Sequence, residues 1–160
     1  MSVIKAKRKE SRFEVLVHAN NVHDMLLELM QRDFGIKNMA ILVRKKYLFG
    51  KTQEADYKYY VMVMNQSKTR IDYLSRQLIA SVRAANVLYP VSEAELDRRR
   101  DYQNNAIASC EQIKSELQRV VDIFEVDINI YARYFQAINR EVHLIKTWRQ
   151  RDNKLKSRLQ

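Results

Sequence analysis

The stretch EADYKYYVMVMNQSKTRIDYLSRQLIASVRAANVLYP, residues 54–90, decides the fold class. It contains no glycine, and its only proline is its last residue, so nothing interrupts a helix before Tyr89. Apolar and small side chains recur along it at steps of three and four residues, the spacing of one helix face. They are Tyr60, Val63, Ser67, Ile71, Leu74, Leu78, Val82 and Ala85. The stretch therefore predicts one long helix from about Glu54 to Tyr89.

Two more long helices are predicted after Pro90. Ser92 and Glu95 fit a capping box, and the helix behind them has the stripe Leu96, Gln103, Ala106, Cys110, Ile113, Leu117, Val120 and Phe124. From Ala106 onward its steps alternate between four and three, as in a coiled-coil-like seam. Asp127 can cap the last helix, whose predicted seam is Ile128, Tyr131, Phe135, Ile138, Val142 and Ile145.

The first part of the chain predicts one further helix and one short segment. Ser11 and Glu14 fit a second capping box with Ser11 as N-cap, and Gly35 supplies a stop. The stripe between them is Phe13, Leu16, Val17, Asn20, His23, Leu27 and Met30. Residues 38–50, NMAILVRKKYLFG, predict a short helix that ends at Gly50, with a buried strand as the alternative. The conformation of residues 36–53 stays open at this point.

Together these elements predict an all-α fold. It is an antiparallel four-helix bundle with a short extra helical segment between the first two long helices. With 2 Gly and 1 Pro, a many-stranded sheet is disfavoured, and 160 residues suit a single domain, 1–160. The first helix is too short to cover the second along its whole length, and the 38–50 segment is expected to cover the end it leaves. A basic N-terminal arm (1–11) and a basic C-terminal helix extension (149–160) complete the predicted organisation.

The motifs favour a protein that is not an enzyme and has no metal or other cofactor. His18 and His23 are five residues apart, so they do not form a ligand pair on one helix face and fit core or surface positions better. RDFG at 32–35 resembles a kinase signature, but no other kinase motif is present. Cys110 is explained as a small buried side chain. A single cysteine, no signal peptide and no apolar run of membrane-spanning length predict a cytoplasmic protein with no membrane partner.

The net charge of +10 predicts a polyanionic partner. RNA or DNA is the commonest in the cytoplasm, and an anionic membrane surface or an acidic protein are the alternatives that charge alone leaves open. In the last helix the predicted seam ends near Trp148, after which basic residues follow with only Asp152 against them. The helix is therefore expected to leave the core near Trp148 and to contact nucleic acid beyond it. The candidate nucleic-acid-binding residues are Lys5, Lys7, Arg8, Lys9, Arg44, Lys45, Lys46, Arg98, Arg99, Arg100, Lys146, Arg149, Arg151, Lys154, Lys156 and Arg158.

Tyrosines interleaved with lysines and arginines mark a second region, with two interpretations. The tyrosines are Tyr47, Tyr57, Tyr59, Tyr60 and Tyr73. Aromatic and basic residues in alternation can stack bases and hold phosphates. The favoured interpretation is that these rings lie at the edge of the core, with their hydroxyls in water.

Three stretches suggest a family. They are KRKESRFEVLVHANNVHDMLLELMQRDFG (7–35), ANVLYPVSEAELDRRRDYQNNAIASCEQIKSELQ (85–118) and INREVHLIKTWRQRDNK (138–154). Together they resemble the accessory variability determinants (Avd) of diversity-generating retroelements, which are similar in fold to the four-helix proteins of ribosomal RNA intervening sequences. The resemblance implies a homopentameric barrel that binds nucleic acid and a reverse transcriptase and supports mutagenic copying of a template RNA. The 36–50 segment and the basic arm depart from the plainer family bundle.

Two functions follow as expectations. The first is a non-enzymatic nucleic-acid-binding accessory protein, a homo-oligomer that partners a reverse transcriptase. The alternative is a structural helical-bundle protein that assembles with another protein and has no direct role on nucleic acid.

Overall fold

In the computed structural model, residues 13–45 and 52–159 are described, and every regular element among them is helical. The order is α1 (Glu14–Gln31), the short 3-10 turn η1 (Asp33–Gly35), α2 (Met39–Lys45), α3 (Gln53–Val87), α4 (Glu93–Phe124) and α5 (Ile128–Leu159). The all-α prediction is confirmed for the described residues. The short segment is a helix, not a strand, over residues 39–45, and its predicted end at Gly50 lies outside the described ranges.

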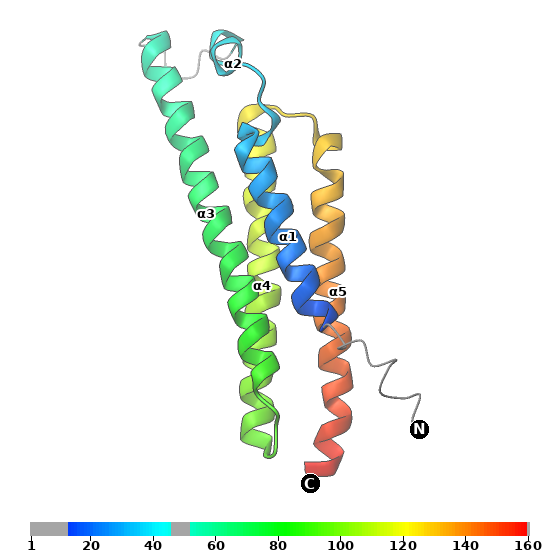
Figure 1. Cartoon of the computed structure of the whole chain (residues 1–160). Coiled ribbons are helices and arrows are strands. Elements are labelled where there is room, and N and C mark those ends of the chain that lie inside the picture. The colour runs from blue at the N-terminus through cyan, green and yellow to red at the C-terminus, as the bar shows by residue number, and fades with distance from the viewer. Residues whose placement is uncertain (1–12, 46–51, 160) are drawn as a thin grey trace, which may run out of the picture.

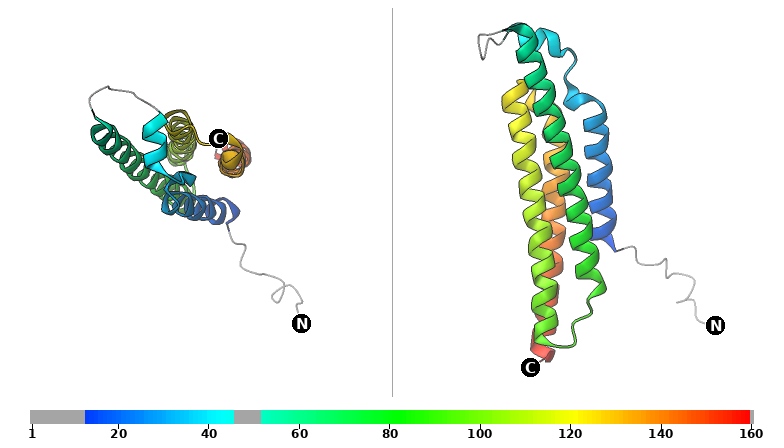
Figure 2. Two further views of the ribbon diagram at one scale, coloured as in Figure 1. Left: turned by 90° about the horizontal axis from the view of Figure 1, so that it is seen from above. Right: turned by 90° about the vertical axis from the view of Figure 1, so that its left-hand side faces the viewer.

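The four long helices lie side by side, and the chain runs up α1, down α3, up α4 and down α5 (Figure 1). Helix α1 packs against α3 and α5, and α4 packs against the same two helices. Seen from above, α2 crosses the end of the molecule where α3 begins (Figure 2). Apolar side chains from α1, α3, α4 and α5 meet in one core.

Helix α2 covers only one of the two ends that the short α1 leaves. It packs on α3 near its N-terminus, because only the three residues 36–38 separate it from η1 at the end of α1. At the opposite end, α3, α4 and α5 continue beyond the start of α1 (Figure 1). The predicted cover is therefore present at the end where α1 finishes and not at the end where it starts.

The predicted stripes of α3 and α4 are confirmed, since all of their residues are buried. The helix starts also agree. Ser92 Oγ accepts from the Glu95 amide at 3.3 Å, and the Glu95 carboxylate accepts from the Val91 amide at 2.8 Å, one residue earlier than in the usual capping box. Asp127 Oδ1 accepts from the Asn129 amide at 2.9 Å, so Asp127 caps α5 as predicted.

Helix α1 starts later than its sequence pattern predicts, and its buried face is rotated. Phe13 is the N-cap residue, so the predicted capping box with Ser11 as N-cap is wrong, and Ser11 itself lies outside the described residues. The Phe13 ring instead packs edge-on against Trp148 at 4.8 Å. The buried residues are Val15, Ala19, Val22, Leu26, Leu29 and Met30. The predicted stripe was wrong in most positions because α1 has two neighbours, α3 and α5, and the face between them is the buried one.

The seam of α5 also differs at its beginning. Ile128 is 52% exposed and Phe135 is only partly buried, whereas Tyr131, Ile138, Val142 and Ile145 are buried as predicted. Helix α5 begins at one end of the molecule, directly after the short connection from α4 (Figure 1). A heptad pattern alone does not reveal where the neighbouring helix stops.

The RDFG segment is a left-handed turn that tertiary contacts hold in place. Helix α1 ends at Gln31, and Asp33, Phe34 and Gly35 all have positive φ, at 48°, 58° and 80°. For Asp33 and Phe34 this backbone is unfavourable. The Phe34 ring is fully buried, Tyr131 Oη donates to the Phe34 carbonyl at 2.7 Å, and Lys68 donates to Asp33. Gly35 thus ends the turn after α1, and not α1 itself as predicted.

Candidate nucleic-acid interface

Among the described residues the hydrophobic core of α5 ends at Trp148, as predicted, but α5 stays packed on α4 beyond that residue. One turn later, the side chain of Asp152 is only 5% exposed. Gln103 Nε2 in α4 donates to Asp152 Oδ2 at 2.8 Å, and Arg99 Nε lies 2.9 Å from the same oxygen. The α4–α5 contact therefore extends at least to Asp152 through polar groups.

Arg99 joins three parts of the chain around this carboxylate. Its guanidinium lies over the Trp148 ring, 4.8 Å from the centroid, and its Nη1 donates to the Leu88 carbonyl at 2.9 Å. The contact of Nε with Asp152 is an ion pair whose angle does not make a hydrogen bond. A largely buried charge is stable only beside an opposite charge, so the pair holds α4 and α5 in one relative position. Arg99 thus fixes the connection between α3 and α4 against α5.

Two further predicted basic residues are also partly occupied with α4–α5 packing. Arg100 Nη2 in α4 donates to Asn153 Oδ1 at 2.7 Å, and its Nη1 lies 3.5 Å from Asp97. Arg149 Nη1 in α5 donates to Asn104 Oδ1 at 2.6 Å. These side chains hold the helices in register, which leaves them less available to a ligand.

The exposed face of the last part of α5 is basic. Residues 146–158 contain one acidic residue, Asp152, and its carboxylate is turned inward to Arg99. Among the described side chains of this part, the exposed charged ones are Lys146, Arg151, Lys154 and Lys156, which we call the α5 basic face. It extends over about 15 Å at 1.5 Å per residue. Such a face attracts the phosphates of a nucleic acid.

The remaining predicted residues divide into two groups. Arg98 is exposed on α4. Lys5, Lys7, Arg8, Lys9 and Lys46 lie outside the described residues, as do the side chains of Arg44, Lys45 and Arg158, whose backbones belong to α2 and α5. The structure therefore uses Arg99, Arg100 and Arg149 in the α4–α5 contact, with Arg99 on the buried Asp152, and it leaves the α5 basic face and Arg98 exposed.

Sequence reasoning missed the inward role of Arg99 and Asp152, although a signal was present. The α4 stripe steps from Leu96 to Gln103, and Arg99 occupies the core position between them, three residues after the first and four before the second. Asp152 follows Trp148 by four residues and so continues the α5 seam. A charged residue at a core position on each of two helices indicates a pair across them.

The connection between α3 and α4 is unusually apolar at its surface. Val87, Tyr89 and Val91 are 83%, 77% and 71% exposed. This connection and the C-terminal end of α5 lie at the same end of the molecule (Figure 1). The bond from Arg99 to the Leu88 carbonyl, together with the Arg99–Asp152 pair, ties the two to each other.

A second buried polar pair links α1 to α5. His18 Nδ1 lies 2.7 Å from Glu141 Oε2, and the Glu141 side chain is fully buried, with no hydrogen-bond partner for Oε1. Burial raises the pKa of Glu141 to about 8. Burial also lowers the pKa of His18, and the nearby Arg140 lowers it further. Both shifts favour the uncharged forms of the two groups, and burial is the main cause of each.

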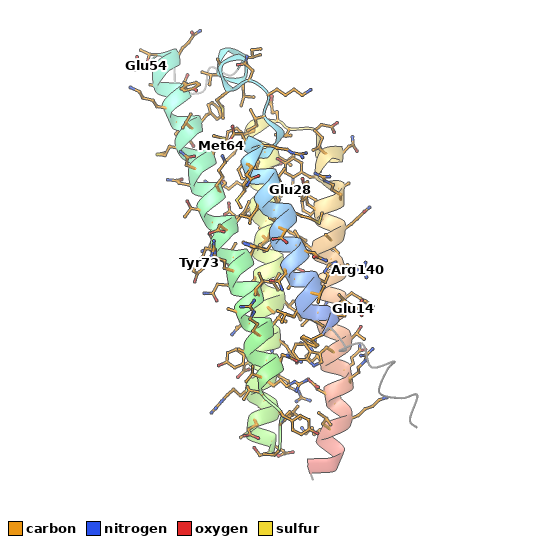
Figure 3. The ribbon with its side chains drawn as sticks, viewed as in Figure 1. Glu14, Glu28, Glu54, Met64, Tyr73 and Arg140 are labelled. Atoms are coloured by element: carbon orange, nitrogen blue, oxygen red, sulfur yellow. The ribbon has the colours of Figure 1, made fainter. Side chains whose placement is uncertain are left out.

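One surface ion pair also links α5 to α1 near this buried pair. Arg140 Nη2 lies 3.5 Å from Glu14 Oε1, and the two side chains meet across α5 and α1 (Figure 3).

Cys110 in α4 is buried. Burial, and to a smaller extent the charge of Glu141, raises the pKa of its thiol. A buried thiol of this kind is chemically inert. These groups therefore fit structural roles.

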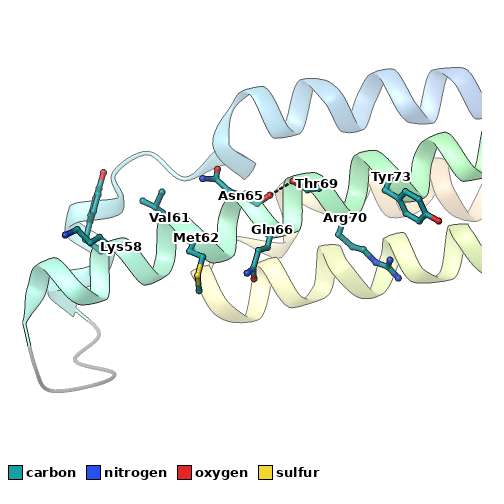
Figure 4. Close-up of a pocket in the computed structure, with 9 residues that line it drawn as sticks. Lys58, Val61, Met62, Asn65, Gln66, Thr69, Arg70 and Tyr73 are labelled. Atoms are coloured by element: carbon teal, nitrogen blue, oxygen red, sulfur yellow. Dashed lines mark hydrogen bonds between the residues drawn. The ribbon is translucent and has the colours of Figure 1, made fainter.

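The outer side of α3 carries a shallow, open surface with a mostly apolar lining, which we call the α3 groove. All the described residues that line it come from α3, including Val61, Met62 and Tyr73 (Figure 4). Tyr57, Tyr59 and Tyr73 are 44%, 37% and 52% exposed, while Tyr60 is buried against Phe124. Tyr47 lies outside the described residues. Three rings of the tyrosine-rich region therefore face the solvent, and one belongs to the core.

Within residues 13–45 and 52–159, no three His, Cys, Asp or Glu side chains are grouped so as to hold a metal ion. No helix in the described part of the chain is both long and apolar enough to span a membrane. Comparisons of the chain with models of protein families, with curated proteins and with solved structures find no significant match.

Proposed function

We propose that this protein is a non-enzymatic, nucleic-acid-binding accessory protein built as an antiparallel four-helix bundle, with α2 as the extra segment. The α5 basic face contacts the phosphates of RNA or DNA. The observation that carries this proposal is the orientation of Asp152. The one acidic residue of 146–158 is buried against Arg99, so the exposed face of this part carries Lys146, Arg151, Lys154 and Lys156 without an exposed acid from the same stretch.

The experiment measures binding of RNA and DNA at several salt concentrations. Each phosphate that a lysine or arginine neutralises steepens the fall of log affinity with log salt by about 0.7 to 0.9. We expect the triple variant Lys146→Gln, Arg151→Gln, Lys156→Gln to bind more weakly across many sequences, with a salt slope flatter by roughly 2 to 3. Arg149 is left unchanged because its bond to Asn104 holds α5 against α4.

A matched control removes the same charge elsewhere. Lys58, Arg76 and Arg119 each form an ion pair with an acidic residue three or four positions away on their own helix. We expect their triple replacement by Gln to leave the salt slope unchanged. Equal losses in both variants would mean that only the overall charge matters, and the α5 basic face would have no special role.

The proposed partner and assembly rest on the resemblance to accessory variability determinants. It supplies the reverse transcriptase, the mutagenic copying of a template RNA, and a homo-oligomer that would be a pentamer. Self-association is supported by the exposed apolar side chains on the outer side of α3, such as Met62 and Tyr73, which a second copy of the chain could cover. A cytoplasmic location fits the buried free Cys110. Co-purification of the two proteins from cells that express both is the direct test of the partner.

The α3 groove also favours the second candidate, a structural bundle that assembles with another protein. In that case the groove would receive a helix of the partner, and the basic charge would serve solubility. Nucleic-acid affinity that the α5 triple variant leaves unchanged, together with a stable protein complex that a groove variant disrupts, would select this function.

A further inference from the structure

Two exposed features lie at the same end of the molecule, where α3 passes into α4 and α5 finishes (Figure 1). One is the α5 basic face, and the other is Tyr89, whose ring is 77% exposed in the connection between the helices. A tyrosine normally buries most of its ring and exposes its hydroxyl, so an exposed ring in a short connection needs a reason. Neighbouring Pro90 is buried, which anchors the connection while the Tyr89 side chain faces water.

The position of Tyr89 relative to α5 is set by buried contacts. Arg99 donates to the carbonyl of Leu88, the residue before Tyr89, at 2.9 Å. The same guanidinium stacks on Trp148 and pairs with Asp152, both in α5. Arg100 adds a bond to Asn153 at 2.7 Å. The ring and the basic face are thus parts of one rigid end of the molecule.

We propose that this end binds single-stranded nucleic acid, with an unpaired base stacked on Tyr89 and the adjoining phosphates on the α5 basic face. The inference rests on the proposed function and names its substrate class. An exposed ring next to a basic groove or face is the arrangement that holds single strands, because every base has a face that can stack. In a duplex the bases are already stacked on each other, so no unpaired base is available to stack on Tyr89.

The test uses the full-length protein and two probes. One is an oligouridylate of about 20 nucleotides, longer than the roughly 4 to 16 nucleotides that one small single-strand-binding domain covers. The other is an RNA duplex of the same length. We expect Tyr89→Ala and Tyr89→Leu to weaken oligouridylate binding by about 5-fold to 150-fold, the range found for losing one stacked base. Tyr89→Phe keeps the ring and should bind like the wild type.

The duplex probe and the α5 triple variant distinguish the outcomes. Unchanged duplex binding in all three Tyr89 variants supports the proposal, and equal weakening on both probes overturns it. If Tyr89→Ala binds oligouridylate normally while the α5 triple variant does not, the stacking role is wrong and the proposed function stands. If neither variant changes binding, both are wrong.

Two other roles of an exposed ring are checked with the same proteins. Light scattering of Tyr89→Ala reports whether the ring is a contact between copies of the chain. Sedimentation with vesicles of anionic phospholipid reports whether the ring and the basic face bind a membrane surface. A change in either measurement without a change in oligouridylate binding overturns the proposal.

Discussion

Arg99 in α4 and Asp152 in α5 form a buried ion pair, with Arg99 Nε 2.9 Å from Asp152 Oδ2. The pair lies beyond the last apolar residue of the predicted α5 seam. It changes the role of the C-terminal part of α5 from a free extension to a helix that is fixed on one side and basic on the other. The interface that we propose depends on that fixed orientation.

Removal of Asp152 should strongly destabilise the fold. Asp152→Ala leaves the Arg99 charge buried without its partner, which typically costs about 3 to 5 kcal/mol. Asp97→Ala, which removes the exposed acid of the Arg100 pair, is the control and should change stability by no more than about 0.5 kcal/mol. Urea unfolding measures both values. Similar losses in the two variants would contradict a structural role for the buried pair.

The stability of the protein should fall as pH rises from about 6.5 to about 8. Glu141 has a pKa of about 8 in the folded protein against 4.5 as its ordinary value, so folding takes up a proton between these limits and stability falls with rising pH. The lowered pKa of His18 acts in the opposite direction, but only below its ordinary value of 6.5. Above pH 6.5, therefore, Glu141 is the one of these two groups that changes the unfolding free energy with pH.

Glu141→Gln tests this pH dependence. The amide keeps the shape of the side chain and does not titrate, so the decrease in unfolding free energy between about pH 6.5 and pH 8 should become smaller. Glu111→Gln is the control, since Glu111 is exposed on α4 and pairs with Lys114. If both variants retain the full pH dependence of the wild type, Glu141 does not hold the proton in the folded protein.

Loss of the Tyr131 hydroxyl should destabilise the turn after α1. Tyr131→Phe removes the bond to the Phe34 carbonyl and leaves a buried acceptor unpaired, which costs about 1 to 3 kcal/mol. Tyr134→Phe removes a hydroxyl that accepts a hydrogen bond from the exposed Arg133, and it should lower the unfolding free energy by less. Faster hydrogen exchange at the amides of residues 33–36 in Tyr131→Phe, and not in Tyr134→Phe, would show that the effect is local.

The protein should self-associate through the α3 groove. Light scattering at micromolar concentration should give a mass well above the 19.1 kDa of one chain. Met62, which is 48% exposed in the groove, is a suitable position for a charge, and Met62→Asp should lower the mass. Val87→Asp introduces the same charge outside the groove and should not. A wild-type protein with the mass of one chain would contradict both the oligomer and the homopentamer that the resemblance implies.

The sequence by itself determined the helical class and the long elements. In α3 and α4 every predicted core position is buried, because their apolar and small residues recur at steps of three and four and so fall on one side of each helix. The starts at Ser92 and Asp127 were equally local, since each cap needs only the amides of the next few residues. The basic charge of the last part of α5 was also visible in the sequence alone.

Only the tertiary structure decided which face of α1 is buried and where each charge of the candidate interface points. The α1 face depends on the positions of α3 and α5, which no local pattern contains. Arg99 was predicted to contact nucleic acid and instead pairs with Asp152, a residue 53 positions away, because a buried charge is stable only beside its partner. That pairing turns the one acid of residues 146–158 inward, and through Arg99 it fixes the connection that carries Tyr89 against α5.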